Sequence, residues 1–188
     1  MKQLLFLFAS FLFLSSSCRK HKNINPIDQL PPETQTGANT FGCLVNGQVF
    51  KPGGAQLSGG SLQCNYQFLG SGAGGGYYFR IIGINDNSSN RQTVGIFTDS
   101  LEITEGASYD LKEAFIKPSA YGLYSFSTTQ LPTRADYETT DMYTGVLTIK
   151  KLDIVNQIVS GTFWFNGINS NGDTVRVSDG RFDVRYTQ

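Results

Sequence analysis

Apolar and polar residues alternate with a period of two along most of the chain after residue 40. The segment 62–68, LQCNYQF, places an apolar side chain at every second position between glutamine and asparagine. Successive side chains of a strand point to opposite faces, so this pattern predicts a strand with one buried face. Residues 77–84, YYFRIIGI, are apolar on both faces and predict a central strand. The other alternating segments of this first part are 41–45, 48–50, 93–97 and 121–128.

The last third carries the clearest pattern and predicts an antiparallel meander. Asn156-Gln157 and Asn171-Gly172 supply turns there, Asp179-Gly180 supplies another, and Asn46-Gly47 predicts an earlier hairpin. The strands expected in this part are 144–152, 158–168, 173–178 and 180–186.

Two stretches are harder to interpret. Tyr109–Leu111 fits a short strand, whereas Leu111–Phe115 fits one helical turn, and 131–141 is polar and irregular. About ten short strands without a helical period predict an all-β fold of two packed antiparallel sheets, a β-sandwich. A flattened β-barrel is the alternative, because barrel strands alternate in the same way.

The first 17 residues predict a secretory signal peptide. Met1 and Lys2 precede the apolar run 4–14, and Ser15–Ser17 lead to Cys18. The apolar run is too short to span a bilayer as a helix. The run that ends at Cys18 resembles the lipobox of bacterial lipoproteins, although its leucine, Leu14, lies one position too far from the cysteine. The resemblance implies a diacylglyceryl anchor on Cys18; plain secretion after the same cleavage is the alternative.

Residues 18–40 predict a lipidated cysteine followed by a flexible tether. The stretch after Cys18 holds three prolines and few large apolar groups, so burial cannot offset the entropy of ordering it. Its cluster Arg19–Lys22 either lies against anionic lipid headgroups or only solubilises the tether. Residues 41–188 have the size of a single domain.

Two groups of motifs resemble a family of Bacteroidetes lipoproteins defined only as a domain of unknown function. One is TQTGANTFGCLVNGQVF, which ends at Phe50; the other is SGTFWF, which ends at Phe165, with NGDTVRVSDGRFDV, which ends at Val184. The resemblance implies an envelope-anchored β domain without assigned catalytic residues. Surface-exported lipoproteins of this group typically carry acidic residues after the cysteine, whereas Arg19 and Lys20 are basic. We therefore expect an outer-membrane anchor that faces the periplasm.

Charge and histidine content exclude several function classes. The chain carries 15 basic and 15 acidic side chains, so no basic field attracts nucleic acid. The single histidine, His21, lies in the predicted tether. Serine and cysteine triads that need an imidazole base cannot form in the domain, and histidine-dependent zinc sites fail for the same reason. We predict no catalytic residue, metal site or cofactor.

Cys43 and Cys64 remain after Cys18 is assigned to lipid. Both lie on the apolar side of predicted strands, and an exported protein is exposed to oxidation. A disulfide between them would close a loop of about 20 residues. Two buried free thiols are the alternative.

The acidic residues form two groups along the chain. A glycosidase needs two carboxyl groups facing each other across a sugar, and the sequence does not show such facing. Turn chemistry accounts for Asp173 and Asp179. The oxygen-rich loops 86–90 and 169–173 lack the glutamate of the known calcium loop, so we interpret them as turns. The two groups are Asp99, Glu102 and Glu105, and Asp173, Asp179 and Asp183.

Aromatic residues supply the candidate binding surface, for which we single out Trp164, Tyr121 and Tyr124. Trp164 points away from its neighbours Phe163 and Phe165, so it either stacks on a sugar or partner protein or only covers the sheet edge. Our first hypothesis is a non-enzymatic envelope lipoprotein that binds a glycan or another envelope protein, or has a structural role. The alternatives are a barrel-type carrier of an apolar ligand and a glycan-acting enzyme with paired carboxylates.

Overall fold

The computed structural model describes residues 25–54, 60–70, 74–86, 89–114, 117–128 and 134–188. The predicted signal peptide, Cys18, His21 and the basic cluster lie outside the described residues. The described part is built almost entirely of strands, with one short 3-10 turn, η1 (Pro26–Gln29), and no α-helix among the described residues. This confirms the predicted all-β class.

The described residues form twelve strands. They are β1 (Thr40–Val45), β2 (Gln48–Phe50), β3 (Gly53–Gly54), β4 (Leu62–Leu69), β5 (Gly76–Asp86), β6 (Asn90–Asp99), β7 (Ser108–Leu111), β8 (Ser119–Thr128), β9 (Arg134–Glu138), β10 (Gly145–Asp153), β11 (Ile158–Ile168) and β12 (Thr174–Arg185).

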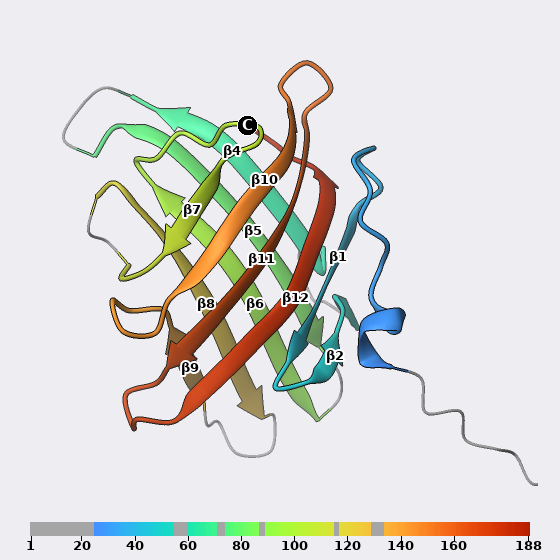
Figure 1. The fold of residues 1–188 in the computed structure, drawn as a ribbon, viewed down its shortest axis with the longest axis vertical. Helices are drawn as coiled ribbons and strands as arrows, with labels where there is room; N and C mark the ends of the chain where they lie inside the picture. The colour runs from blue at the N-terminus through green and yellow to red at the C-terminus, as the bar shows by residue number, and fades with distance from the viewer. Residues whose placement is uncertain (1–24, 55–59, 71–73, 87–88, 115–116, 129–133) are drawn as a thin grey trace, which may run out of the picture.

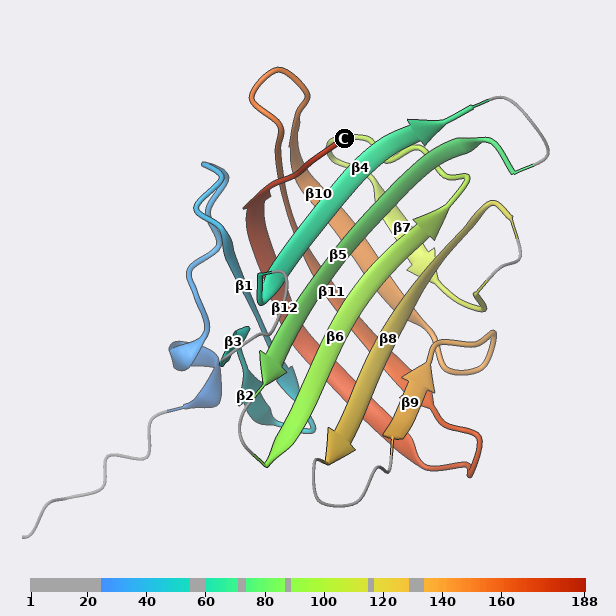
Figure 2. The same cartoon turned by 180° about the vertical axis from the view of Figure 1, so that it is seen from behind.

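The strands form two layers that face each other (Figures 1 and 2). Strands β4, β5, β6 and β8 are hydrogen-bonded neighbours in one layer, and β7, β10, β11, β12, β1 and β2 follow one another in the second. Strand β9 joins the layers at one corner, because it pairs with β8 and, through the Glu138–Ile168 pair, with β11. At the other side a single bridge between Asn65 and Thr187 joins β4 to the segment after β12. The result is an open mixed sheet folded into a sandwich, so the flattened barrel is not formed.

Aromatic rings fill the space between the layers. Phe79 of β5 lies 6.1 Å, between ring centroids, from Phe182 of β12 in the opposite layer. Phe163 of β11 lies 6.4 Å from Phe182 and 5.3 Å from Phe41 of β1. Ring pairs at these separations add to the stabilisation that burial itself provides. The same core contains Ile81 and Ile96, which are fully buried.

The end of the predicted tether, residues 25–40, is part of the folded domain, which corrects our expectation of a flexible chain for these residues. Leu30 is buried, and Pro31 packs against Gly42 of β1 so closely that a Cβ on this glycine would lie 2.6 Å from the proline Cδ. Backbone N–H groups of Gly37 and its neighbours donate to the buried carboxylate of Asp183. Residues 25–40 are therefore anchored by a polar contact that composition does not reveal.

The disulfide that we considered between Cys43 and Cys64 is not formed, and both thiols are free. Cys43 pairs with Phe50 in the β1–β2 hairpin, whereas Cys64 pairs with Ile81 in the opposite layer. Burial raises the pKa of both thiols far above the usual value, so they stay protonated and pack as small apolar groups.

Two further expectations differ from the structure. Asp179 does not end a strand: its φ of 54° and a register shift between Phe163 and Phe165 form a bulge inside a continuous β12. The polar stretch 131–141, expected to be irregular, contains β9. The Asn46-Gly47 turn is confirmed, since its φ values of 49° and 79° are those that a two-residue hairpin requires.

Candidate functional site

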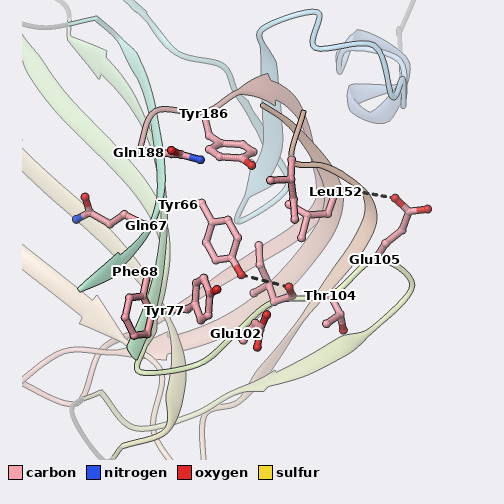
Figure 3. A pocket seen from close by; sticks show the side chains of 12 residues that line it. Tyr66, Gln67, Phe68, Tyr77, Glu102, Thr104, Glu105, Leu152, Tyr186 and Gln188 are labelled. Carbon is pink, nitrogen blue, oxygen red and sulfur yellow. Dashed lines mark hydrogen bonds between the residues drawn. The ribbon is translucent and has the colours of Figure 1, made fainter. Parts of the chain in front are cut away.

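A cavity of about 580 Å³ opens between the two layers at one end of the sandwich (Figure 3). The ends of β4, β5 and β10 form its walls, together with the segment 102–105 and the residues after β12. Ligand pockets in proteins typically have volumes of about 300–1,000 Å³ and are lined mainly by apolar and aromatic groups. Four aromatic side chains line this one, which are Tyr66, Phe68, Tyr77 and Tyr186.

The side-chain alternation of β4 and β5 brings three rings to one side of the cavity, and we call Tyr66, Phe68 and Tyr77 the aromatic wall. Tyr66 and Phe68 are two residues apart on β4 and face the other layer, and Tyr77 lies opposite Phe68 in the register of β4 and β5. The rings of Tyr66 and Tyr77 are stacked with centroids 5.4 Å apart, and the Phe68 ring lies 5.1 Å from that of Tyr77. Tyr186 meets Tyr66 edge to face at 5.8 Å. These four rings form one cluster, in which Phe68 is exposed, Tyr77 is half-buried, and Tyr66 and Tyr186 are buried behind them.

This end of the sandwich is not sealed. Phe68 points toward the space between the layers, yet it is 57% exposed, and Ile154 at the β10–β11 hairpin is 64% exposed. Farther along the same inner faces, Phe79 and Ile81 are fully buried. An inward-facing residue such as Phe68 normally completes the core, so its exposure means that the opposite layer does not cover it at this end. Together with Ile154 of the hairpin it leaves apolar surface free for contact.

Polar groups lie beside the rings. The Tyr66 hydroxyl donates to the Ile103 carbonyl at 3.4 Å, and Glu102 lies next to it (Figure 3). Burial raises the pKa of Tyr66 to about 12, and the negative charge of Glu102 acts in the same direction. The hydroxyl therefore remains protonated at neutral pH.

Glu105 positions the segment that forms one wall. Its Oε2 atom accepts a hydrogen bond of 2.9 Å from the backbone N–H of Leu152 on β10 (Figure 3). Tyr109 adds a second connection, because its hydroxyl accepts from the backbone N–H of Thr104 at 2.8 Å. The segment carrying Glu102 is thus fixed between β7 and β10.

Tyr186 lies among the lining side chains and is only 2% exposed. Its hydroxyl is buried and has no hydrogen-bond partner among the described residues. Leaving a buried hydroxyl unpaired costs about 1–3 kcal/mol, so such groups in folded proteins call for an explanation. Burial also raises the pKa of Tyr186, which keeps the group a neutral phenol. Protein atoms cover the hydroxyl on all sides, so a ligand in the cavity does not contact it in this conformation.

The structure does not bring Trp164, Tyr121 and Tyr124 together. Trp164 projects from the outer face of β11 and is 44% exposed. Tyr121 stacks on Phe97 at 4.9 Å on the outer face of the opposite layer. Tyr124 is buried and lies 5.7 Å from Tyr137, so it does not contribute to an exposed surface.

The acidic residues that the sequence analysis grouped together make different contacts in the structure. Glu102 and Glu105 share the cavity, whereas Asp99 forms an ion pair of 3.0 Å with Lys117. Asp173 closes its loop through hydrogen bonds to the Asn169 side chain at 2.8 and 3.0 Å, as turn chemistry predicts. No group of three or more histidine, cysteine, aspartate or glutamate side chains suited to a metal ion occurs among the described residues.

Sequence reasoning missed Tyr66, Tyr77 and Tyr186 as site residues. Each was identified only as part of a predicted strand, 62–68, 77–84 or 180–186, because the strand register that brings them together is non-local. The signal that pointed toward the site was the pair Glu102 and Glu105, which lies between predicted strands.

The fold and the cavity define an all-β sandwich protein with a ligand-sized opening between its layers. The chain belongs to the family described as a domain of unknown function, DUF6252, whose family model matches residues 78–184. Glu102, Glu105 and Leu152 lie within the matched region, and Tyr66, Tyr77 and Tyr186 lie outside it. No match was found among the curated proteins or among the solved structures. None of the described residues forms a helix long and apolar enough to span a bilayer.

Proposed function

We propose that the protein is a non-catalytic envelope lipoprotein that binds a small ligand in the aromatic cavity. The single observation that carries the proposal is the exposure of apolar side chains at one end of the sandwich, the inward-facing Phe68 and the neighbouring hairpin residue Ile154. A structural domain without a ligand gains stability by burying such groups, so leaving them open costs hydrophobic free energy. Binding compensates for that cost when a ligand covers them.

A lipid anchor on Cys18 is compatible with a cavity that a ligand can reach. The described chain begins near η1, which lies on the flank of the sandwich beside β2, away from the β10–β11 hairpin (Figures 1 and 2). A lipid on Cys18, only a few residues before η1, would hold that flank toward the membrane. The cavity would then face away from the bilayer, into the periplasm.

The anchor has a direct test in the cells that make the protein. We expect labelled palmitate to be incorporated into the wild-type protein and to be lost in the Cys18→Ser variant, because acylation requires the thiol. The labelled wild type should fractionate with the outer membrane and survive protease treatment of intact cells. Unlabelled wild-type protein released in soluble form would contradict the anchor but not the cavity.

Two other functions receive less support. The apolar carrier requires a closed lumen, whereas this sheet is open and its interior is filled by phenylalanine rings. A glycan hydrolase requires one carboxyl group kept protonated by an apolar environment. Glu102 and Glu105 share the cavity, yet both are exposed and Glu105 is engaged by the Leu152 N–H. The arrangement therefore favours binding over hydrolysis.

A neutral fluorescent probe tests the cavity. N-phenyl-1-naphthylamine brightens in apolar surroundings, and we expect it to bind the wild-type protein at the aromatic wall. The Phe68→Ala variant should weaken binding about tenfold, which corresponds to losing about 1.4 kcal/mol of contact. Phe68 is exposed, so the substitution should leave the fold intact.

The matched control is Trp164→Ala, which removes another exposed aromatic side chain outside the cavity. It should leave the affinity for the probe unchanged. Equal losses in the two variants, or a probe affinity that Phe68→Ala does not alter, would contradict the proposal.

A further inference from the structure

The charge of the cavity points to the kind of ligand it takes. Its lining includes the carboxylates of Glu102 and Glu105, and among the described residues no lysine or arginine lines it. Neither glutamate forms an ion pair with another described residue. By contrast, Asp99, which lines a shallower hollow of the outer face, is neutralised by Lys117 at 3.0 Å. The aromatic cavity thus combines apolar surface with unneutralised negative charge.

Aromatic rings next to a carboxylate form a favourable environment for a cation. The face of a tyrosine or phenylalanine ring attracts a positive group through its quadrupole, by about 0.5–2 kcal/mol depending on solvent exposure. Phe68, which is exposed, and Tyr77, which is half-buried, supply such rings, and Glu102 lies near them (Figure 3). An anionic ligand would meet uncompensated carboxylates in the same place, which disfavours it.

Tyr186 lies behind the exposed part of the aromatic cluster. Its ring touches Tyr66 edge to face at 5.8 Å and so helps to hold the Tyr66 ring in place. Its hydroxyl is covered by protein atoms and has no partner among the described residues, so a ligand atom reaches it only if the side chains around it shift. The contacts of the proposed ligand are therefore those of the exposed rings and of Glu102.

We infer that the cavity binds a small organic cation, a ligand whose ammonium group lies against the aromatic wall beside Glu102. This inference rests on the proposed function, since it names the chemical class of ligand for the same cavity. The volume of about 580 Å³ accommodates such a molecule together with an attached apolar or hydroxylated part.

The test compares two compounds of nearly identical shape. Choline carries a quaternary ammonium group, and 3,3-dimethylbutan-1-ol replaces its charged nitrogen with carbon. In isothermal titration calorimetry with the purified wild-type protein, choline should bind at least about tenfold more tightly than the neutral compound. Raising the salt concentration should weaken only choline, because salt screens the attraction between exposed charges.

Removing the charge of Glu102 tests whether this carboxylate causes the preference for choline. Glu102→Gln should lower the choline affinity about tenfold and leave the affinity for the neutral compound within about twofold. Glu113→Gln is the matched control, since Glu113 is an exposed glutamate that does not line the cavity. It should alter neither affinity. The salt titration of the wild type gives an independent readout if Glu102→Gln disturbs the fold.

The outcomes separate this inference from the proposed function. If N-phenyl-1-naphthylamine binds at Phe68 while choline binds no better than its neutral analogue, the preference for a cation is wrong and the cavity remains a ligand site. The same conclusion follows if choline fails to bind or if Glu102→Gln leaves its affinity unchanged. If neither the probe nor either compound binds, the proposed function itself fails.

Discussion

Replacing Asp183 with asparagine is expected to lower the free energy of unfolding by about 2–3 kcal/mol, because hydrogen bonds to a charged acceptor are lost and buried donors are left unpaired. The carboxylate is fully buried and has no cation beside it among the described ion pairs. It instead accepts hydrogen bonds from the Thr34 hydroxyl at 2.6 Å and from the backbone N–H groups of Thr36, Gly37 and Ala38 at 2.7–3.2 Å. Asparagine keeps the volume, but its NH₂ group cannot accept any of these bonds.

The effect of Asp183 depends on pH with a definite sign. Burial would raise the pKa of this carboxyl group, but the hydrogen bonds from Thr34, Thr36, Gly37 and Ala38 outweigh it and hold the pKa below the usual value. Because the folded-state pKa is lowered, the ionised group stabilises the fold above about pH 4 and this contribution is lost as the pH falls through the lowered value. The asparagine variant should lack that part of the acid dependence.

Urea denaturation followed by circular dichroism measures both effects. Asp179→Asn is the control, because Asp179 lies on the same strand but is exposed. It should change the free energy of unfolding by less than about 0.5 kcal/mol. A loss below about 1 kcal/mol in Asp183→Asn would show that the contact with residues 34–38 contributes little to the fold.

Truncating Phe163 to alanine should destabilise the protein by about 3–5 kcal/mol and lower Tm by roughly 10 °C. The Phe163 ring is buried between Phe41 and Phe182, with centroids 5.3 and 6.4 Å away. It also lies over Gly180, where a Cβ would come within 2.6 Å of the ring. The neighbouring backbone leaves little freedom to close the gap, so the variant retains most of the cavity it creates.

The residue that follows Phe163 provides its control. Trp164→Ala removes an even larger aromatic group from the outer face of the same strand, so it should cost less than about 1 kcal/mol. Thermal and urea unfolding, both followed by circular dichroism, compare the two variants without depending on tryptophan fluorescence. Similar losses in both would mean that the side-chain alternation of β11 has been assigned to the wrong face.

Much of the strand layout follows from local pattern. The segments 62–68, 144–152 and 158–168 were predicted almost to their observed limits, because their alternation matches a sheet with one buried face. The break expected at Asp179 was wrong, since a bulge accommodates the positive φ of this residue within a continuous strand. Turn chemistry alone does not distinguish a bulge from a strand end.

The contacts of residues 25–40 could not be read from composition. Their polar, proline-containing sequence is typical of a mobile linker, and the groups that hold them are mainly backbone N–H donors of Thr36, Gly37 and Ala38. Every residue carries such a donor, so the acceptor decides the outcome. That acceptor, Asp183, lies near the other end of the chain, and only the pairing of β1 with β12 brings the two together.

The candidate site was only partly visible in the sequence. Glu102 and Glu105 were recognised as neighbouring carboxylates, but Tyr66 and Phe68 looked like ordinary core residues of an alternating strand. Alternation shows which side chains of a strand face inward. It does not show whether the opposite layer extends far enough to cover them. The opening depends on where β10 and the segment 102–105 end relative to β4, which is a property of the three-dimensional fold.

Mapping the bound probe on the protein tests the central claim most directly. We predict that N-phenyl-1-naphthylamine added to the ¹⁵N-labelled protein shifts the backbone amide signals of residues 66–68, 77, 102–105 and 152 in NMR spectra. The signals around Trp164 and Tyr121, on the two outer faces, should not move. Shifts centred on either outer face, with the residues between the layers unaffected, would contradict the assignment of the open end of the sandwich as the ligand site.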